Sequence, residues 1–130
     1  MAADRRELKI AIVGLGRVGT AFLNKFSERK NGIKIVATVE MNDKAIGITV
    51  ARSKGIPVYK TSREFVSSSE NVDIIFDLTG NADTRRTLRS ELARSGNQHS
   101  VIAPEVIAYM IWDLMGETAD FPGDHQEKGY

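Results

Sequence analysis

The chain of 130 residues contains no cysteine, which excludes disulfide bonds, thiolate metal sites and a cysteine nucleophile. It has only two histidines, and neither His99 nor His125 has a second ligand at metal-site spacing, so we expect no metal site. The formal net charge is only +1, which gives a nucleic-acid partner no overall electrostatic support, and we expect none. No apolar run is long enough for a signal peptide or a membrane span, so we expect a cytoplasmic protein without a membrane partner.

A glycine-rich turn follows the first apolar run of the sequence. Gly14, Gly16 and Gly19 fit the spacing G-x-G-x-x-G. Gly14 allows a tight turn off a strand, Gly16 lets a pyrophosphate approach the backbone, and Gly19 lets the next helix pack closely on the strand. The free amides and the dipole at the start of that helix, at Arg17 and Val18, favour an anion, and the Arg17 side chain can reach the same pyrophosphate.

An acidic residue, Glu40, ends the second apolar run, about twenty residues past the glycine turn, where a dinucleotide site needs a carboxylate for the adenosine ribose hydroxyls. Such a carboxylate repels a 2′-phosphate, so Glu40 predicts NAD rather than NADP. Lys44 and Arg52 lie close by in the sequence and leave NADP open. The competing interpretation of Glu40 is an ordinary solvated strand end, and the upstream glycines favour the cofactor.

Apolar runs alternate with amphipathic segments along most of the chain, which predicts strands alternating with helices. The predicted strands cover 8–13, 33–39, 56–59, 72–78 and 99–103. Right-handed crossovers then give a single α/β domain, a three-layer Rossmann-like doubly wound parallel sheet with strand order 3-2-1-4-5. We expect a flexible arm at 1–7, the Rossmann NAD-binding domain at 8–116 and a flexible tail at 117–130.

This strand order places the ends of the first and fourth strands side by side, at the point where ligands bind to open α/β sheets. The turn after the fourth strand should therefore face the glycine turn, and we add Thr79, Gly80 and Asn81 to the predicted cofactor site. Asn81 is also the predicted N-cap of the following helix. Asp73 and Asp77 share one face of the fourth strand. That leaves a paired acid/base role open, but a polar strand end is the favoured interpretation and no catalytic residue is predicted.

The last predicted helix, 104–115, is apolar on two sides. One stripe consists of Ile107, Ile111 and Leu114, and the other consists of Val106, Tyr109 and Trp112. A single sheet can cover only one side of a helix, so we expect the second stripe to contact a second subunit or another partner. The alternative is that the residues from Gly116 onward fold back over it.

Residues 8 to about 103 resemble the N-terminal NAD-binding half of dehydrogenases of the glucose-fructose oxidoreductase type and of homoserine dehydrogenase. The glycine turn, Val39-Glu40 and the segment 73–80 carry this resemblance. Those enzymes have a Glu-Lys-Pro sequence after the fifth strand, in which the lysine serves as acid/base. Here Ile102-Ala103-Pro104 keeps the proline and lacks the lysine. The resemblance therefore implies a cofactor-binding domain without that catalytic group.

Nearly all of residues 8 to 115 also resemble the small Rossmann-like domains that precede sensor histidine kinases and related signalling proteins in sulfate- and metal-reducing bacteria. The matching segments are 45–48, 55–58 and 112–114. In those proteins the last helix runs on toward the signalling module, whereas here we expect Gly116 to stop it. The resemblance implies a signalling partner.

Three functions are open from the sequence. The favoured one is a non-catalytic sensory or regulatory module that binds NAD(H) and acts through a homodimer or partner interface on the last helix. The second is an NAD-dependent oxidoreductase whose substrate site is completed by another subunit or by a missing domain. The third is an interaction domain that has kept the fold and lost the ligand.

Overall fold

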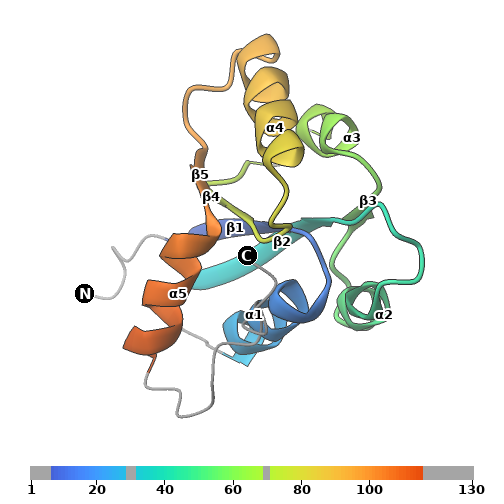
Figure 1. Ribbon diagram of the computed structural model, residues 1–130, viewed down its shortest axis with the longest axis vertical. Coiled ribbons are helices and arrows are strands. Elements are labelled where there is room, and N and C mark those ends of the chain that lie inside the picture. The colour runs from blue at the N-terminus through green and yellow to red at the C-terminus, as the bar shows by residue number, and fades with distance from the viewer. Residues whose placement is uncertain (1–6, 29–31, 69–70, 116–130) are drawn as a thin grey trace.

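The computed structural model describes residues 7–28, 32–68 and 71–115, in which five parallel strands form one sheet in the order β3-β2-β1-β4-β5 (Figure 1). The elements, in chain order, are β1 (Leu8–Val13), α1 (Arg17–Glu28), β2 (Ile33–Val39), α2 (Ile46–Ser53), β3 (Val58–Tyr59), α3 (Ser62–Ser67), β4 (Ile74–Asp77), α4 (Ala82–Arg94), β5 (Val101–Ala103) and α5 (Glu105–Leu114). The predicted strand order and Rossmann-like α/β fold are confirmed. The tail at 117–130 and all but the last residue of the arm at 1–7 lie outside the described residues.

Helices cover both faces of the sheet. On one face α1, α2 and α5 enclose an apolar core with β1, and on the other face α3 and α4 enclose a second core (Figure 1). Ile10 and Ile12 of β1 belong to the first core, and Ala11 and Val13 belong to the second. This strand is therefore buried on both sides, as its continuous apolar run predicts.

Three strands are shorter than the sequence suggests. β3 begins at Val58, since Pro57 has no amide hydrogen to donate to the ladder. β5 begins at Val101, because the amides of His99 and Ser100 donate instead to the side chain of Asn97. β4, predicted over 72–78, covers Ile74–Asp77.

The last helix differs from its prediction in one important way. Trp112 is only 7% exposed, and its ring lies 5.3 Å from that of Phe22 in α1, centroid to centroid. Because α5 packs beside α1 as well as against the sheet, two neighbours bury this helix rather than one. The prediction that Trp112 contacts a second subunit is therefore wrong.

Within the described part of the chain, no helix is long and apolar enough to cross a membrane.

A different stripe of α5 remains open to solvent. Val106, Met110 and Leu114 are 63%, 53% and 77% exposed, and they follow one another at intervals of four residues along the helix. Of the three residues predicted to form the interface, Val106 lies on this stripe, Tyr109 is partly buried and Trp112 lies in the core.

Candidate functional site

The carboxyl ends of the three central strands meet at one level. Val13 at the end of β1 pairs with Val39 on one side and with Asp77 on the other. The next residues continue these pairings, because the Gly14 amide donates to the Val39 carbonyl at 2.8 Å and the Leu78 amide donates to the Val13 carbonyl at 2.9 Å. The glycine turn is thus fixed between the ends of β2 and β4, at the predicted switch point.

The three glycines of the turn are required for different reasons. Gly14 has a φ of +101°, a conformation that other residues rarely adopt. A Cβ on Gly19 would overlap the carbonyl oxygen of Gly14, so only glycine lets α1 start this close to β1. Gly16 has neither constraint, since its φ is not positive and a Cβ there would meet no protein atom within 4 Å. The fold alone therefore does not explain Gly16.

Helix α2 also packs against the glycine turn. Leu15, between the first two glycines, is fully buried, and its carbonyl accepts a hydrogen bond from the Gly47 amide at 3.2 Å and one from the Thr20 hydroxyl at 3.1 Å. A Cβ on Gly47 would lie only 2.7 Å from the Cβ of Leu15. Gly47, which disfavours a helix by propensity, is thus needed here for close packing.

Glu40 holds the turn in place from the end of β2. Its Oε1 accepts a hydrogen bond from the Leu15 amide at 2.6 Å, and its Oε2 accepts one from the Asn42 amide at 2.9 Å. Such charge-assisted bonds are short and strong. Each carboxylate oxygen can accept more than one bond, so Glu40 can still bind a hydroxyl donor.

The N-terminus of α1 is open. Among the described residues, no hydrogen bond uses the amide of Arg17 or that of Val18, and the first amide bonded back along the chain is that of Thr20, to the Gly16 carbonyl. The first turn of α1 carries no acidic side chain. These amides point to where an anion is favoured.

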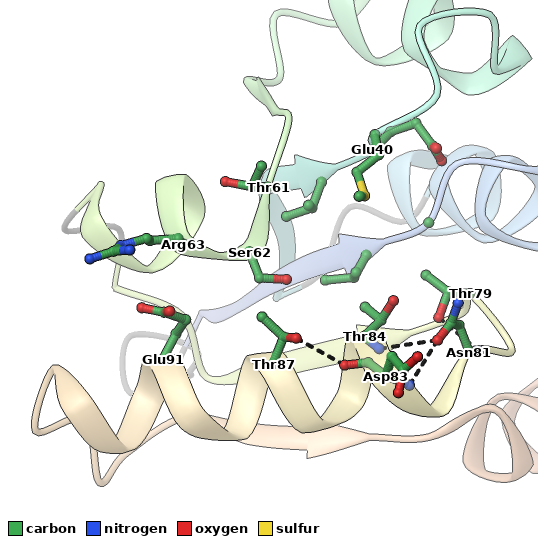
Figure 2. Close-up of a pocket in the computed structure, with 14 residues that line it drawn as sticks. Glu40, Thr61, Ser62, Arg63, Thr79, Asn81, Asp83, Thr84, Thr87 and Glu91 are labelled. Carbon is green, nitrogen blue, oxygen red and sulfur yellow. Dashed lines mark hydrogen bonds between the residues drawn. The ribbon is translucent and has the colours of Figure 1, made fainter.

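Two adjoining cavities lie at this edge of the sheet. The smaller, of about 360 Å³, is lined by Gly14, Gly16, Arg17, Val18, Glu40, Leu78 and Thr79. The larger, of about 600 Å³, shares Gly14, Glu40 and Thr79 with it and continues between α3 and α4 (Figure 2). Six of the nine predicted site residues line the smaller cavity and Asn81 lines the larger, whereas Gly19 and Gly80 line neither.

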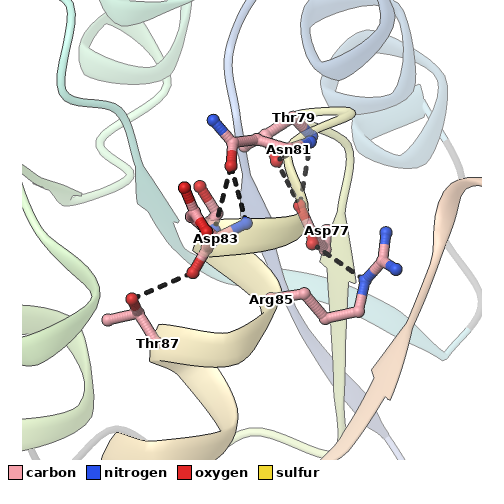
Figure 3. Close-up of polar contacts among 7 residues, drawn as sticks. Asp77, Thr79, Asn81, Asp83, Arg85 and Thr87 are labelled. Carbon is pink, nitrogen blue, oxygen red and sulfur yellow. Dashed lines mark hydrogen bonds and ion pairs between the residues drawn. The ribbon is translucent and has the colours of Figure 1, made fainter.

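The turn after β4 is held by a buried carboxylate. Asp77 is fully buried, and its Oδ1 accepts hydrogen bonds from the Thr79 amide at 3.1 Å and from the Thr79 hydroxyl at 2.7 Å (Figure 3). Its Oδ2 accepts a longer bond, of 3.4 Å, from Arg85 Nε of α4. Arg85 thus pairs with a buried carboxylate. Asp77 positions Thr79, which borders both cavities.

The predicted N-cap of α4 is confirmed. The side-chain oxygen of Asn81 accepts hydrogen bonds from the amides of Asp83 at 2.8 Å and of Thr84 at 3.2 Å. The cap thus provides an acceptor for two backbone amides at the start of α4, beside the larger cavity.

The interpretation of Asp73 and Asp77 as an acid/base pair is wrong. Asp73 lies before β4, at the opposite edge of the sheet, where its Oδ2 accepts a hydrogen bond from the Lys9 amide at 2.9 Å. Its Oδ1 lies 2.5 Å from Nε2 of His99. Among the described residues, no group of three or more His, Asp or Glu side chains could hold a metal ion.

Sequence reasoning missed the side chains of α3 and α4 that line the larger cavity. They are Ser62, Arg63, Asp83, Thr84, Thr87 and Glu91. At the start of α3, the Thr61 hydroxyl accepts a hydrogen bond from the Glu64 amide at 3.1 Å and caps the helix. Nothing in the sequence indicates that these two helices share a cavity.

The chain is similar over part of its length to two kinds of curated protein. It is 37% identical over 79 residues to the acetaldehyde dehydrogenase of Spirochaeta aurantia. The matched residues are 60% of this chain and 26% of that protein. It is 32% identical over 88 residues to the redox-sensing transcriptional repressor Rex of Geobacillus kaustophilus. The matched residues are 68% of this chain and 39% of that protein. The chain thus spans well under half the length of these relatives.

Solved structures share the fold at lower identity. The apo scyllo-inositol dehydrogenase of Lactobacillus casei superposes with a TM-score of 0.59 at 20% identity, over 75% of this chain and 28% of that one. A structure described as RSP in complex with β-NAD⁺ and operator DNA superposes with a TM-score of 0.54 at 19% identity, over 88% of this chain and 64% of that one. Both support the Rossmann-like fold.

The similarity to a transcriptional repressor conflicts with the expectation that nucleic acid is not a partner. That expectation rested on the net charge of this chain, which spans only 39% of the repressor. A charge balance over one domain does not describe a longer protein. The family itself is shown by a separate match over residues 5–81, which include the glycine turn, Glu40 and the turn after β4. By that match, this chain belongs to the family described as the CoA binding domain.

Proposed function

We propose that this domain binds NAD(H) between the glycine turn and the turn after β4, and that the bound cofactor regulates an interface instead of reacting within the domain. The observation that carries this proposal is the open space over Gly16. Gly14 and Gly19 are glycines because the fold requires them, whereas the space beside Gly16 meets no protein atom and opens into the smaller cavity.

The smaller cavity suits a diphosphate. The unused amides of Arg17 and Val18 border it at the positive end of the α1 dipole, and the Arg17 guanidinium adds a charge. A diphosphate here approaches the backbone at Gly16, where a side chain would stand in its way.

Glu40 then sets the direction of the cofactor. Its carboxylate borders both cavities, so a ribose that donates its hydroxyls to Glu40 lies between the diphosphate and the larger cavity. The adenine follows into the larger cavity, and the nicotinamide half extends past Leu78 and Thr79.

The same carboxylate selects among related cofactors. NAD, NADP and coenzyme A all contain adenosine diphosphate, but NADP carries a phosphate on the ribose 2′-oxygen and coenzyme A carries one on the 3′-oxygen. Two backbone amides hold Glu40 in place, so it cannot turn away from an added phosphate. Although the family is described as the CoA binding domain, we expect this chain to bind NADH more tightly than NADPH or coenzyme A.

A regulatory role is supported by the Rex relative, which is described as a redox-sensing transcriptional repressor. The second candidate, an NAD-dependent oxidoreductase completed by another subunit or domain, is supported by the acetaldehyde dehydrogenase relative. The two differ in a direct assay. Hydride transfer from bound NADH to acetaldehyde or another small carbonyl compound favours the oxidoreductase, and tight NADH binding without turnover favours regulation.

The exposed stripe of α5 is the proposed regulatory interface. Val106, Met110 and Leu114 form an apolar row that nothing covers within the described residues. We propose that it packs against the same row of a second copy, as closed homodimers commonly do. Sedimentation should show a dimer that Met110→Glu converts to a monomer, whereas Trp112→Phe, a change in the core, should leave the mass unchanged.

Two glycine variants test the cofactor site itself. Gly16→Ala adds a methyl group where there is room, so its melting temperature should stay close to that of the parent protein. The methyl group fills the space that the diphosphate needs, so NADH affinity should fall at least tenfold, which corresponds to about 1.4 kcal/mol. Calorimetric titration and thermal melts measure the two effects separately.

Gly19→Ala is the matched control. Its methyl group overlaps the Gly14 carbonyl, so it should lower stability first and binding only as a consequence. If Gly16→Ala binds NADH as well as the parent protein does, or if the parent protein shows no binding at millimolar NADH, the proposal is wrong.

A further inference from the structure

Hydroxyl groups from two helices converge on the larger cavity. Ser62 of α3 is only 8% exposed, yet it lines this cavity, and its hydroxyl has no hydrogen-bond partner among the described residues. Thr84 and Thr87 of α4 line the cavity from the opposite side. In Figure 2 the side chains of Ser62 and Thr87 point into the space between the two helices. The Ser62 hydroxyl is therefore free to bond to a molecule that occupies the cavity.

The hydroxyl of Thr87 has its polarity fixed. Its single proton is donated to the backbone carbonyl of Asp83 at 3.0 Å, one turn earlier in α4. Only lone pairs are then left to face the cavity, so toward a ligand Thr87 is an acceptor. The hydroxyl of Ser62 has no such bond and can turn to donate or to accept.

The part of the cavity nearest the sheet is apolar. Val13 and Val39, at the ends of β1 and β2, line it, and the exposed side chain of Met41 lies beside them. Apolar walls with a few fixed polar groups suit a flat heterocycle, with its faces against the walls and its polar edge toward the hydroxyls.

We infer that Ser62 and Thr87 recognise a 6-aminopurine base, in that the exocyclic amine donates to Thr87 and the Ser62 hydroxyl donates to the adjacent ring nitrogen. The inference rests on the proposed function, because Glu40 and the diphosphate site direct the base into this cavity. It adds a specificity that the fold alone does not supply. A 6-oxopurine presents a carbonyl oxygen to the lone pairs of Thr87, so two acceptors meet and the bond is lost.

The test compares two cofactors that differ at this one group, NADH and reduced nicotinamide hypoxanthine dinucleotide. The parent protein should bind NADH about tenfold more tightly, the difference expected from one hydrogen bond and one repulsive contact. Thr87→Val has nearly the same shape and no acceptor, so it should bind the two cofactors almost equally. Thr87→Ser restores the acceptor and should restore the preference.

Ser62→Ala should weaken NADH binding several-fold, with a smaller change in the ratio, because the Ser62 hydroxyl can turn to suit either base. Equal binding of both cofactors by the parent protein, or an unchanged ratio in Thr87→Val, overturns the inference and leaves NADH binding itself intact. If neither cofactor binds the parent protein, it is the proposed function that fails. Thermal melts of each variant show whether an altered ratio comes from a loss of folding.

Discussion

The two edges of the sheet use polar side chains in opposite ways. At the amino edge the groups satisfy one another. Asp73 accepts from the Lys9 amide and contacts His99, and the Ser100 hydroxyl donates to the Val72 carbonyl at 2.6 Å. At the carboxyl edge several groups are left over. The amides of Arg17 and Val18 and the hydroxyls of Ser62 and Thr84 have no partner among the described residues.

This difference separates structural polar groups from groups that await a ligand. Strands at both edges end in exposed backbone that must be satisfied, and the amino edge shows that this chain can satisfy it with its own side chains. Where the glycine turn, Glu40 and Thr79 meet, by contrast, the described side chains leave several polar groups without a partner. Variants at the amino edge should therefore change stability alone, and variants at the carboxyl edge should change stability, binding or both, according to which group is removed.

The largest effect is expected from Gly19→Ala, at the structural part of the carboxyl edge. Its methyl group cannot coexist with the Gly14 carbonyl, so α1 must move away from β1. Overpacking of this kind costs about 3 kcal/mol or more, a large part of the stability of a small domain. Urea unfolding followed by circular dichroism measures the loss. An unchanged midpoint would show that α1 can shift freely, and the close approach would then have no structural role.

The next effect is expected from Asp77→Ala. The change removes the acceptor of the Thr79 amide and hydroxyl and leaves Arg85 without its partner, at a cost of about 2–3 kcal/mol. Because Thr79 borders both cavities, NADH affinity should fall as well. Asp83→Ala, which removes an exposed carboxylate from the first turn of α4, is the control and should change the midpoint of unfolding much less. Equal losses in both variants contradict the role given to Asp77.

A smaller effect, confined to stability, is expected from Asp73→Ala at the amino edge. The Lys9 amide loses its bond to a carboxylate that is largely buried, at a cost of about 1–2 kcal/mol. His99→Ala removes only the exposed partner and should cost less than about 1 kcal/mol. Neither variant should alter NADH affinity in a calorimetric titration. A change in affinity for Asp73→Ala would break the distinction between the two edges.

The fold was predictable because its signals are local. Strand and helix periods, together with the glycine turn, are enough to predict the order 3-2-1-4-5, and that order brings the ends of β1 and β4 together. Gly14, Gly16 and Glu40 were predicted as site residues from their spacing alone, and the structure places all three on the lining of the smaller cavity. Contacts between the turns then followed from the topology.

What could not be predicted depends on which elements meet in space. The pattern of the last helix shows that two sides are apolar, but it does not show that α1 would cover Trp112 and leave Met110 in solvent. Ser62 and Thr87 lie on helices that are ordinary in sequence, and only the packing of α3 beside α4 makes them walls of one cavity. The sequence predicted that Asp77 lies near the end of a strand. It did not predict the pairing of Asp77 with Arg85, which depends on how α4 packs beside β4.

The smallest effect belongs to an exposed ion pair at the carboxyl edge. The hydrogen bond and the charge of Lys60, whose Nζ lies 2.7 Å from Oδ1 of Asp43, lower the pKa of the Asp43 carboxyl, with a lesser contribution from Arg52. Because the folded-state pKa is lowered, the pair contributes stability above the usual pKa of about 3.9, and the contribution disappears as the pH falls through the lowered value. In Lys60→Met, titration of the carboxyl carbon by NMR should show the pKa of Asp43 rising toward its usual value, while the melting temperature at neutral pH barely changes. A large drop in melting temperature would instead show that this solvent-exposed ion pair stabilises the fold as strongly as the buried contacts of Asp77 do.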